Sequence, residues 1–218
     1  RAGQRLGGAA ALEQAQRELG RHQKAHLLGE EHRRDIDADN PALLVQHAAR
    51  DADQLAERDP LTNLYNRRSF SRRMDEELAR QRREASPLSL ALLDLDHFKR
   101  VNDSHGHAAG DEVILRLVGH LGQVLRGSDL CGRWGGEEFL VAFPGAALLD
   151  AGRVLERLRE AIAAVPGPLP FSFSAGVTQW RDGDDLDTML YRADEQLYRA
   201  KREGRDRVCY DRPPEAVA

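Results

Sequence analysis

The sequence predicts an α/β protein, in which a mixed central sheet is flanked by helices and preceded by a helical N-terminal extension. Three observations support this fold class. A strongly apolar run covers residues 88–96, a segment with two adjacent glycines at 129–145 has the pattern of a β-hairpin, and amphipathic segments at helical spacing lie between the strands. Strand and helix patterns that alternate in this way are typical of a sheet covered by helices.

The N-terminal segment, residues 1–57, has a composition of its own, rich in Ala, Glu, Gln, Arg and His and without aromatic side chains. We expect two helices here, over residues 9–37 and 41–57, and the second begins at Asn40-Pro41, a favourable N-cap followed by proline at the first helical position. An apolar seam continues along the second helix at Leu44, Ala48 and Leu55. Two interpretations stay open: helices that pair with a second copy of the chain, and a solvated linker.

The main domain is expected over residues 58–212, followed by a flexible tail at 213–218. Helical periodicity predicts helices over residues 66–85, 110–127, 146–165 and 185–204. The last of these ends at Gly204, a residue type favoured just beyond a helix. Apolar runs predict strands over residues 88–96, 171–180 and 207–210, in addition to the hairpin.

The composition excludes several classes of protein. With 218 residues, 41% of them hydrophobic and 31% charged, the chain can form one sizeable domain with an appendage. A net charge of −4 does not favour binding to nucleic acid or to an anionic membrane surface. The two cysteines, Cys131 and Cys209, lie far apart and indicate reduced thiols. Without a signal peptide or a membrane-length apolar run, we expect a cytoplasmic protein, and the first residue, Arg1, suggests a fragment of a longer chain.

The hairpin segment contains "RWGGEEF", in which two glycines precede two carboxylates. We expect Gly135 and Gly136 to form the turn with positive φ and to leave room for a ligand. Glu137 and Glu138 repel each other unless a cation or a proton lies beside them. Asp94 ends the apolar strand, so carboxylates from two segments could bind magnesium together. A strand-end turn at Asp94 and a solvated turn at Glu137 are the alternatives.

Five segments together resemble one known family, the GGDEF diguanylate cyclase domains. They are "DPLTNLYNRR" (59–68), "DLDHFKRVNDSHGHAAGD" (94–111), "GGEEF" (135–139), "SAGV" (174–177) and "YRAKREGRDRV" (198–208). The resemblance covers residues 58–212 in the family's order and implies a palm-like α/β fold. It also implies a homodimer that condenses two GTP molecules into cyclic di-GMP and two pyrophosphates.

The resemblance implies a role for individual acidic residues. Each active site would hold two Mg²⁺ (or Mn²⁺) ions. Their ligands would be Asp94, the carbonyl of Leu95 and Glu137, and Glu138 would complete the coordination shell. Glu137 would also take the proton of the 3′-hydroxyl. Lys99 is expected to be the second catalytic residue. Coordination of the hydroxyl by a metal could replace a separate base.

Nucleotide contacts follow from the same resemblance. Guanine would be bound by Asn102 and Asp111, with His107 close by. There are structural alternatives for both residues: Asp111 could be the N-cap of a helix, and Asn102 could lie at a helix end. The phosphates would be bound by Lys99, Lys201, Arg205 and backbone N–H groups at Phe98.

An RxxD motif lies just before the hairpin, at Arg126 and Asp129. In this family that spacing marks a site where the product inhibits, and the alternative is a capped helix end. Two residues depart from the family pattern: Asp206 stands where Asn is commoner, and His97 where an aromatic residue is usual. Two rival functions stay open, a catalytically inactive domain that binds nucleotide or cyclic di-GMP, and a scaffold built on the N-terminal helices.

Overall fold

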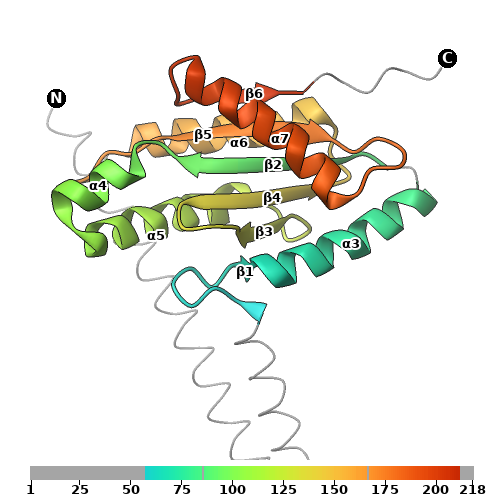
Figure 1. The fold of residues 1–218 in the computed structure, drawn as a ribbon, viewed down its shortest axis with the longest axis horizontal. Helices are drawn as coiled ribbons and strands as arrows, with labels where there is room; N and C mark the ends of the chain where they lie inside the picture. The colour runs from blue at the N-terminus through green and yellow to red at the C-terminus, as the bar shows by residue number, and fades with distance from the viewer. Residues whose placement is uncertain (1–56, 85, 166, 212–218) are drawn as a thin grey trace, which may run out of the picture. The chain divides into compact units, whose positions relative to one another are not determined.

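A mixed six-stranded sheet forms the centre of the described domain, with the strand order β1-β3-β4-β2-β5-β6 (Figure 1). The computed structural model describes residues 57–84, 86–165 and 167–211. The predicted helix 9–37, nearly all of the predicted helix 41–57 and the tail 213–218 therefore lie outside the described residues. Within the described part of the chain, no helix is long and apolar enough to cross a membrane.

The strands are β1 (Tyr65–Asn66), β2 (Leu88–Leu95), β3 (Leu130–Arg133), β4 (Glu138–Pro144), β5 (Phe173–Gln179) and β6 (Val208–Tyr210). β2 lies at the centre and pairs antiparallel with both β4 and β5. β3 and β4 form the predicted antiparallel hairpin, while the edge strands β1 and β6 pair parallel with β3 and β5. The mixed sheet expected from the sequence is confirmed.

The helices are α3 (Arg67–Glu84), α4 (Phe98–His105), α5 (His107–Val124), α6 (Leu148–Ala164) and α7 (Leu186–Arg202). Buried side chains of α3 and α7 pack in one cluster on one face of the sheet. Buried side chains of α5 and α6 pack in a second cluster on the other face. The sheet is therefore the middle layer of three.

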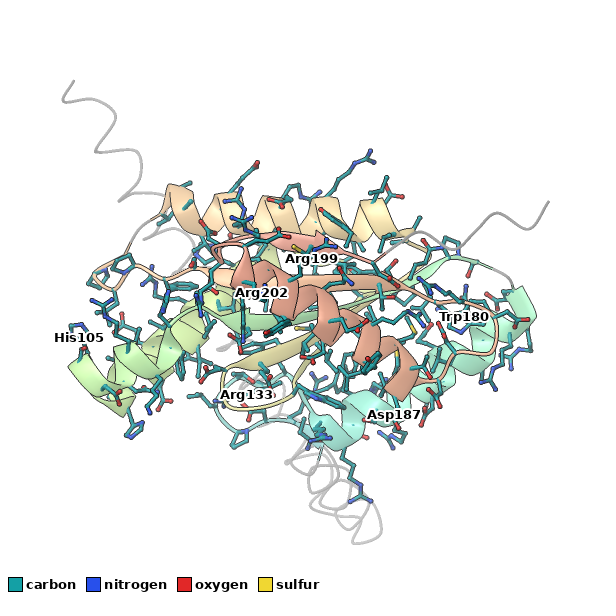
Figure 2. The ribbon with its side chains drawn as sticks, turned by 45° about the horizontal axis from the view of Figure 1, so that its top comes forward. His105, Arg133, Trp180, Asp187, Arg199 and Arg202 are labelled. Carbon is teal, nitrogen blue, oxygen red and sulfur yellow. The ribbon has the colours of Figure 1, made fainter. Side chains whose placement is uncertain are left out.

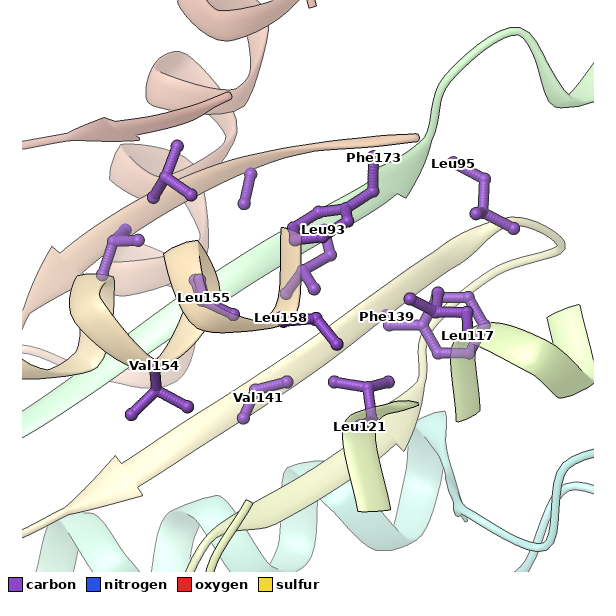
Figure 3. Close-up of a cluster of buried hydrophobic side chains, with 14 of the residues drawn as sticks. Leu93, Leu95, Leu117, Leu121, Phe139, Val141, Val154, Leu155, Leu158 and Phe173 are labelled. Atoms are coloured by element: carbon purple, nitrogen blue, oxygen red, sulfur yellow. The ribbon is translucent and has the colours of Figure 1, made fainter. Parts of the chain in front are cut away.

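β2 is buried along its whole length, which explains its unbroken apolar sequence. Alternate residues point to opposite faces, so Leu90 and Leu92 pack toward α3 and α7, whereas Leu93 and Leu95 pack toward α5 and α6. Figure 3 shows side chains of this second cluster, to which the sheet contributes Leu93 and Phe139 and α6 contributes Leu158. The strand that carries Asp94 is thus fixed from both sides.

One boundary differs clearly from the sequence-based expectation. The helix predicted from residue 110 begins at His107, directly after α4 ends at His105. Gly106, with φ of 83°, makes the sharp connection, and its N–H donates to the carbonyl of Asn102 over 2.8 Å. Because Asp111 lies inside α5, its alternative role as an N-cap is wrong.

Candidate active site

The acidic residues of the hairpin meet Asp94 at the end of β2. Asp94 is the register partner of Glu138 across the β2–β4 pair. The backbone N–H of Leu95 donates to the carbonyl of Glu137 at 3.2 Å. The sheet register therefore brings together the two carboxylate-bearing segments that the sequence singled out.

The turn of the hairpin is closed by backbone bonds from Trp134 and Gly135 to the carbonyl of Glu138, at 2.8 and 3.2 Å. The expectation of positive φ at Gly135 and Gly136 is wrong, since among the described residues the glycines with positive φ are Gly106, Gly145, Gly183 and Gly204. A Cβ atom on Gly135 would lie 2.7 Å from Glu138 Oε2. A side chain at 135 would therefore displace the carboxylate of Glu138 from its position in the turn.

The charge balance of the site is set by burial and by one lysine. Burial raises the pKa of Asp94, and the ammonium of Lys201, 2.8 Å from Asp94 Oδ2, opposes that rise. The pKa of Glu137 is raised first by burial and then by the negative charges of Asp94 and Glu138. The cluster therefore carries more negative charge than the described part of the chain neutralises, and additional positive charge would stabilise it.

The donor atoms of this cluster fit a magnesium ion. They are hard oxygens, and Mg²⁺ is held in proteins by one or two carboxylates while phosphates and waters fill its other positions. Asp94 and Glu137 supply two carboxylates that repel each other, and the carbonyl of Leu95 ends the same strand. Across the described ranges, no group of three or more His, Cys, Asp or Glu side chains is arranged to hold a metal by itself.

The cations expected to bind phosphate differ in their placement. Lys201, near the end of α7, contacts Asp94, and Arg205, in the turn after α7, is near enough to lower the pKa of Asp94. Lys99 lies exposed in the first turn of α4. The side chain of Phe98 is 7% exposed and belongs to the core, so only its backbone N–H, at the start of α4, can face a ligand.

The expected guanine contacts lie on the α4–α5 pair. Asn102 Oδ1 is buried and lacks a hydrogen-bond partner among the described residues. A Cβ atom on Gly110 would lie 2.0 Å from this oxygen, so the glycine lets the two helices close around it. Asp111 follows Gly110 on α5, and both Asp111 and His107 are exposed. A buried acceptor without a donor is an uncommon feature, and a ligand N–H could satisfy it once the side chain turns out from between the two helices.

The RxxD residues form a local turn beside a pocket. The N–H of Arg126 donates to Asp129 Oδ2 at 2.9 Å, and the N–H of Asp129 donates to the carbonyl of Arg126 at 3.0 Å. The pocket has a volume of about 200 Å³ and is lined by Arg126, Asp129, Phe143, Gly145, Ala146, Asp150, Arg153, Val154 and Arg157. Its three arginines could bind an anion, and the turn is compatible with both interpretations of the motif.

Arg133, labelled in Figure 2, is a residue of the site that the sequence argument missed. Its guanidinium donates to the carbonyl of Gly136 within the turn, at 2.8 Å from Nη2, and to Asp59 Oδ1, at 3.1 Å from Nη1. Asp59 also accepts bonds from the N–H and hydroxyl of Thr62. A cation next to an acidic turn was the signal that could have identified it.

Asp96 is the second missed residue, although it lies only two positions from Asp94. Its carboxylate accepts hydrogen bonds from the hydroxyls of Ser172 and Ser174 and from the N–H of Asp206. Asp206 therefore contributes its backbone here, while its side chain lies 3.6 Å from Arg159. The other departure from the family pattern, His97, is exposed at the N-cap of α4 with φ of 57°.

Comparison with known proteins identifies the family. The family model described as "Diguanylate cyclase, GGDEF domain" matches residues 56–207. The chain belongs to the GGDEF diguanylate cyclase domain family. The resemblance seen in the five sequence segments is thereby confirmed, and the three-layer arrangement is the palm-like fold of GGDEF domains.

Three known proteins of this family are similar to this chain in sequence or structure. Diguanylate cyclase DgcP of Pseudomonas aeruginosa is 49% identical over 164 residues, which cover 72% of this chain and 24% of the relative. The coiled coil and GGDEF domain of DgcB from Caulobacter crescentus, solved with c-di-GMP, is similar with a TM-score of 0.76 and 29% identity, covering 83% of this chain and 98% of that one. Diguanylate cyclase SiaD of Pseudomonas aeruginosa, solved with its activator SiaC, has a TM-score of 0.69 and 38% identity, covering 95% and 84%. The chain spans about a quarter of the length of DgcP.

Proposed function

We propose that this GGDEF domain is a diguanylate cyclase, which condenses two GTP molecules into cyclic di-GMP. Each 3′-oxygen forms a bond to the α-phosphorus of the other GTP, the bond from that phosphorus to the β-phosphate bridging oxygen breaks, and two pyrophosphates and two protons leave. The observation that carries the proposal is the convergence of Asp94, Glu137 and Lys201 at the end of β2.

The carboxylates of Asp94 and Glu137, with the carbonyl of Leu95 and with Glu138 beside them, would hold two magnesium or manganese ions. Bound there, the ions would neutralise charge on the triphosphate. Lys201 then exchanges its contact with Asp94 for one with phosphate, together with Arg205 and Lys99. The N–H groups at Phe98, at the start of α4, add uncharged donors.

Glu137 is the group best placed to accept the proton of a 3′-hydroxyl. Its pKa is raised by burial and by the charges of Asp94 and Glu138, so its carboxylate is a stronger base than an ordinary glutamate. It also lies in the turn, where a substrate can approach it without crossing the sheet. Asp94 shares the raised pKa but is more buried, so access to the substrate is what distinguishes Glu137.

Guanine would be recognised by acceptors on α4 and α5. The exposed carboxylate of Asp111 can accept from the N1–H and N2–H₂ donors of guanine, and the side-chain oxygen of Asn102 can do so after it turns out from between the helices, with His107 close by. Adenine does not present that pair of donors. Selectivity for GTP over ATP would follow, because a mismatched base leaves a buried acceptor unpaired.

Two further parts of the proposal concern assembly and control. One domain supplies groups for one GTP, so a homodimer is needed to bring two substrates together. Cyclic di-GMP would inhibit by binding at Arg126 and Asp129, where the arginine-lined pocket offers planar donors for guanine edges and phosphates. The c-di-GMP complex of the similar DgcB domain supports product binding.

The test is a direct assay of the purified chain. Incubation with GTP and magnesium, followed by chromatography, should yield cyclic di-GMP and pyrophosphate in a ratio of one to two. Binding of GTP or cyclic di-GMP without any product would instead assign the inactive, nucleotide-binding alternative. Stability and assembly that are indifferent to both nucleotides would point to a scaffold.

A further inference from the structure

Asp96 is a buried carboxylate to which the proposed reaction assigns no role. It is 6% exposed. Oδ1 accepts from the hydroxyl of Ser174 at 2.7 Å, and Oδ2 accepts from the hydroxyl of Ser172 at 2.7 Å and from the N–H of Asp206 at 3.0 Å. Its own N–H donates to the carbonyl of Ser172 at 2.9 Å. Both oxygens are used within the protein, so Asp96 differs from Asp94 in having no free acceptor directed at a ligand.

These bonds join three segments that are far apart in the sequence. Asp96 follows β2, Ser172 and Ser174 lie at the start of β5, and Asp206 lies in the turn between α7 and β6. That turn carries Arg205. The carboxylate of Asp96 therefore ties the Asp94 strand to the segment that carries Arg205, a proposed phosphate ligand.

The turn has an unusual backbone that needs such a tie. Arg205 and Asp206 both have left-handed conformations, with φ of 64° and 45°. Side chains disfavour this region, and two residues in succession are rarely found there unless the surroundings impose it. The N–H of Arg205 is held by the carbonyl of Ala200, at 2.9 Å, and the N–H of Asp206 is held by Asp96.

We propose that Asp96 is a positioning residue for the triphosphate: by fixing the turn after α7, it sets Arg205 toward Asp94 and the phosphates. This inference rests on the proposed function for the identity of the nucleotide. The electrostatic effect of Arg205 on Asp94 places the guanidinium within range of the acidic centre. Bonds at Arg205 and Arg207 hold the two ends of the turn, and Asp96 supplies the bond to the backbone N–H of Asp206 between them.

The chemistry of the network distinguishes two substitutions. In Asp96→Ala the serine hydroxyls can rotate to other partners, but the N–H of Asp206 is fixed by the backbone and loses its acceptor. In Asp96→Asn the amide oxygen can accept from both Ser172 and Asp206, while the amide nitrogen donates to Ser174 after that hydroxyl turns. Asparagine should therefore preserve the turn, and alanine should release it.

The experiment measures binding separately from turnover. Titration calorimetry on the full chain with magnesium uses a GTP analogue whose α,β-bridge is methylene, and competition gives the affinity for GMP. We expect Asp96→Ala to weaken the analogue about tenfold, with GMP changed by less than about twofold, because the loss falls on contacts to the β- and γ-phosphates. Asp96→Asn should stay within about threefold of the unsubstituted chain, as should the control Asp103→Asn, which removes an exposed charge from α4.

A double-mutant cycle decides between positioning and general destabilisation. If Asp96 acts through Arg205, Asp96→Ala should weaken the analogue by no more than about twofold in an Arg205→Ala background. Additive losses, or equal losses for GMP and the analogue, would overturn the proposal. If the alanine variant does not fold, Asp96→Glu, which keeps the charge and displaces the carboxylate by one methylene, should give the same selective loss. The two proposals can fail separately. If the losses of affinity from Asp96→Ala and Arg205→Ala are not additive but the chain makes no cyclic di-GMP, the proposed function is refuted and this inference stands.

Discussion

Arg133 joins Asp59 to the turn of the hairpin: its guanidinium lies 3.1 Å from Asp59 Oδ1 and 2.8 Å from the carbonyl of Gly136. Asp59 belongs to the first described segment of the chain, 74 positions away from Arg133 in the sequence. Both side chains of this ion pair are 17% exposed. The entry to the domain and the turn that bears Glu137 are thus connected through one side chain.

Acid should weaken this connection. Burial raises the pKa of Asp59, but hydrogen bonds from Thr62 and Arg133 more than offset it, so its pKa in the folded protein lies below the ordinary value of 3.8. The ionised form is favoured by folding, so its stabilisation is complete well above pH 3.8 and is lost as the pH falls through the folded pKa. Asp59→Asn should therefore lower stability at pH 7 by about 1–3 kcal/mol and flatten the loss of stability in acid, as measured by urea unfolding across pH. An unchanged acid profile would show that Asp59 does not control it.

Loss of a carboxylate from the acidic centre should stop the reaction. Glu137→Gln and Asp94→Asn are each expected to lower cyclic di-GMP formation by about a hundredfold or more, because positive charge at the triphosphate loses its anchor. Circular dichroism and thermal unfolding should show an intact fold, since both changes are nearly isosteric. Asp103→Asn is the matched control and should leave turnover unchanged. Near-normal turnover in either site variant would reject the assignment.

Asp111 should determine the preference for GTP over ATP. Removing its carboxylate leaves guanine donors unpaired, at a cost of roughly 1–3 kcal/mol per group. Asp111→Ala should therefore lose about tenfold or more in affinity for GTP while its weak affinity for ATP is unchanged. Competition with ATP and inosine triphosphate measures this. Full discrimination in the variant would place guanine recognition elsewhere, with Asn102 as the next residue to test.

Product inhibition should depend on the RxxD turn. Activity of the unsubstituted chain should fall as cyclic di-GMP accumulates, and Arg126→Ala should relieve the fall without lowering the initial rate. The reason is that this arginine lines a pocket separate from the acidic centre. Initial rates at increasing product concentrations provide the measurement. Equal inhibition of both proteins would assign Arg126 and Asp129 to a structural turn alone.

Removal of residues 1–57 should make the specific activity depend more steeply on enzyme concentration. A tether that holds two domains together raises their effective concentration, and this advantage is lost on truncation. Binding of GTP and magnesium per domain should stay the same, which serves as the internal control. Assays over a dilution series, paired with mass measurements of assembly, test the idea. If truncation leaves the concentration dependence unaltered, these residues do not drive dimer formation.

Local patterns were sufficient for most of the fold. The unbroken apolar run of β2 predicts a strand buried on both faces, and the glycines at 135–136 predict the hairpin, since both signals lie within a few residues. The sequence pattern predicts the start of α5 at residue 110, three residues later than in the structure, because Gly110 and Asp111 resemble a helix start. In the structure Gly110 is inside α5, where it makes room for the side chain of Asn102.

The supporting contacts of the site could not be predicted in the same way. Asp96 is bonded to Ser172, Ser174 and Asp206, which are 76, 78 and 110 positions away. Periodicity and turn signals report only on neighbours along the chain, whereas these contacts depend on how β2, β5 and the turn after α7 come together. The ligands of the acidic centre carry a chemical signature in the sequence, but the residues that hold them in place do not.

The acidic centre consists of a fixed half and a movable half. Asp94 is built into β2, which has ladder partners on both sides, so it can leave its position only when the sheet opens cooperatively. Glu137 lies just outside β4, in a turn. Hydrogen bonds from the N–H groups of Trp134 and Gly135 to the carbonyl of Glu138, and from Arg133 to the carbonyl of Gly136, hold this turn. Amide hydrogen exchange should therefore be slowest at β2 and much faster at Gly136 and Glu137. Displacement of this turn would break the bond from the Leu95 N–H to the Glu137 carbonyl, but it would leave the pairing of β2 with β5 intact, so the two carboxylates of the centre differ in what holds them.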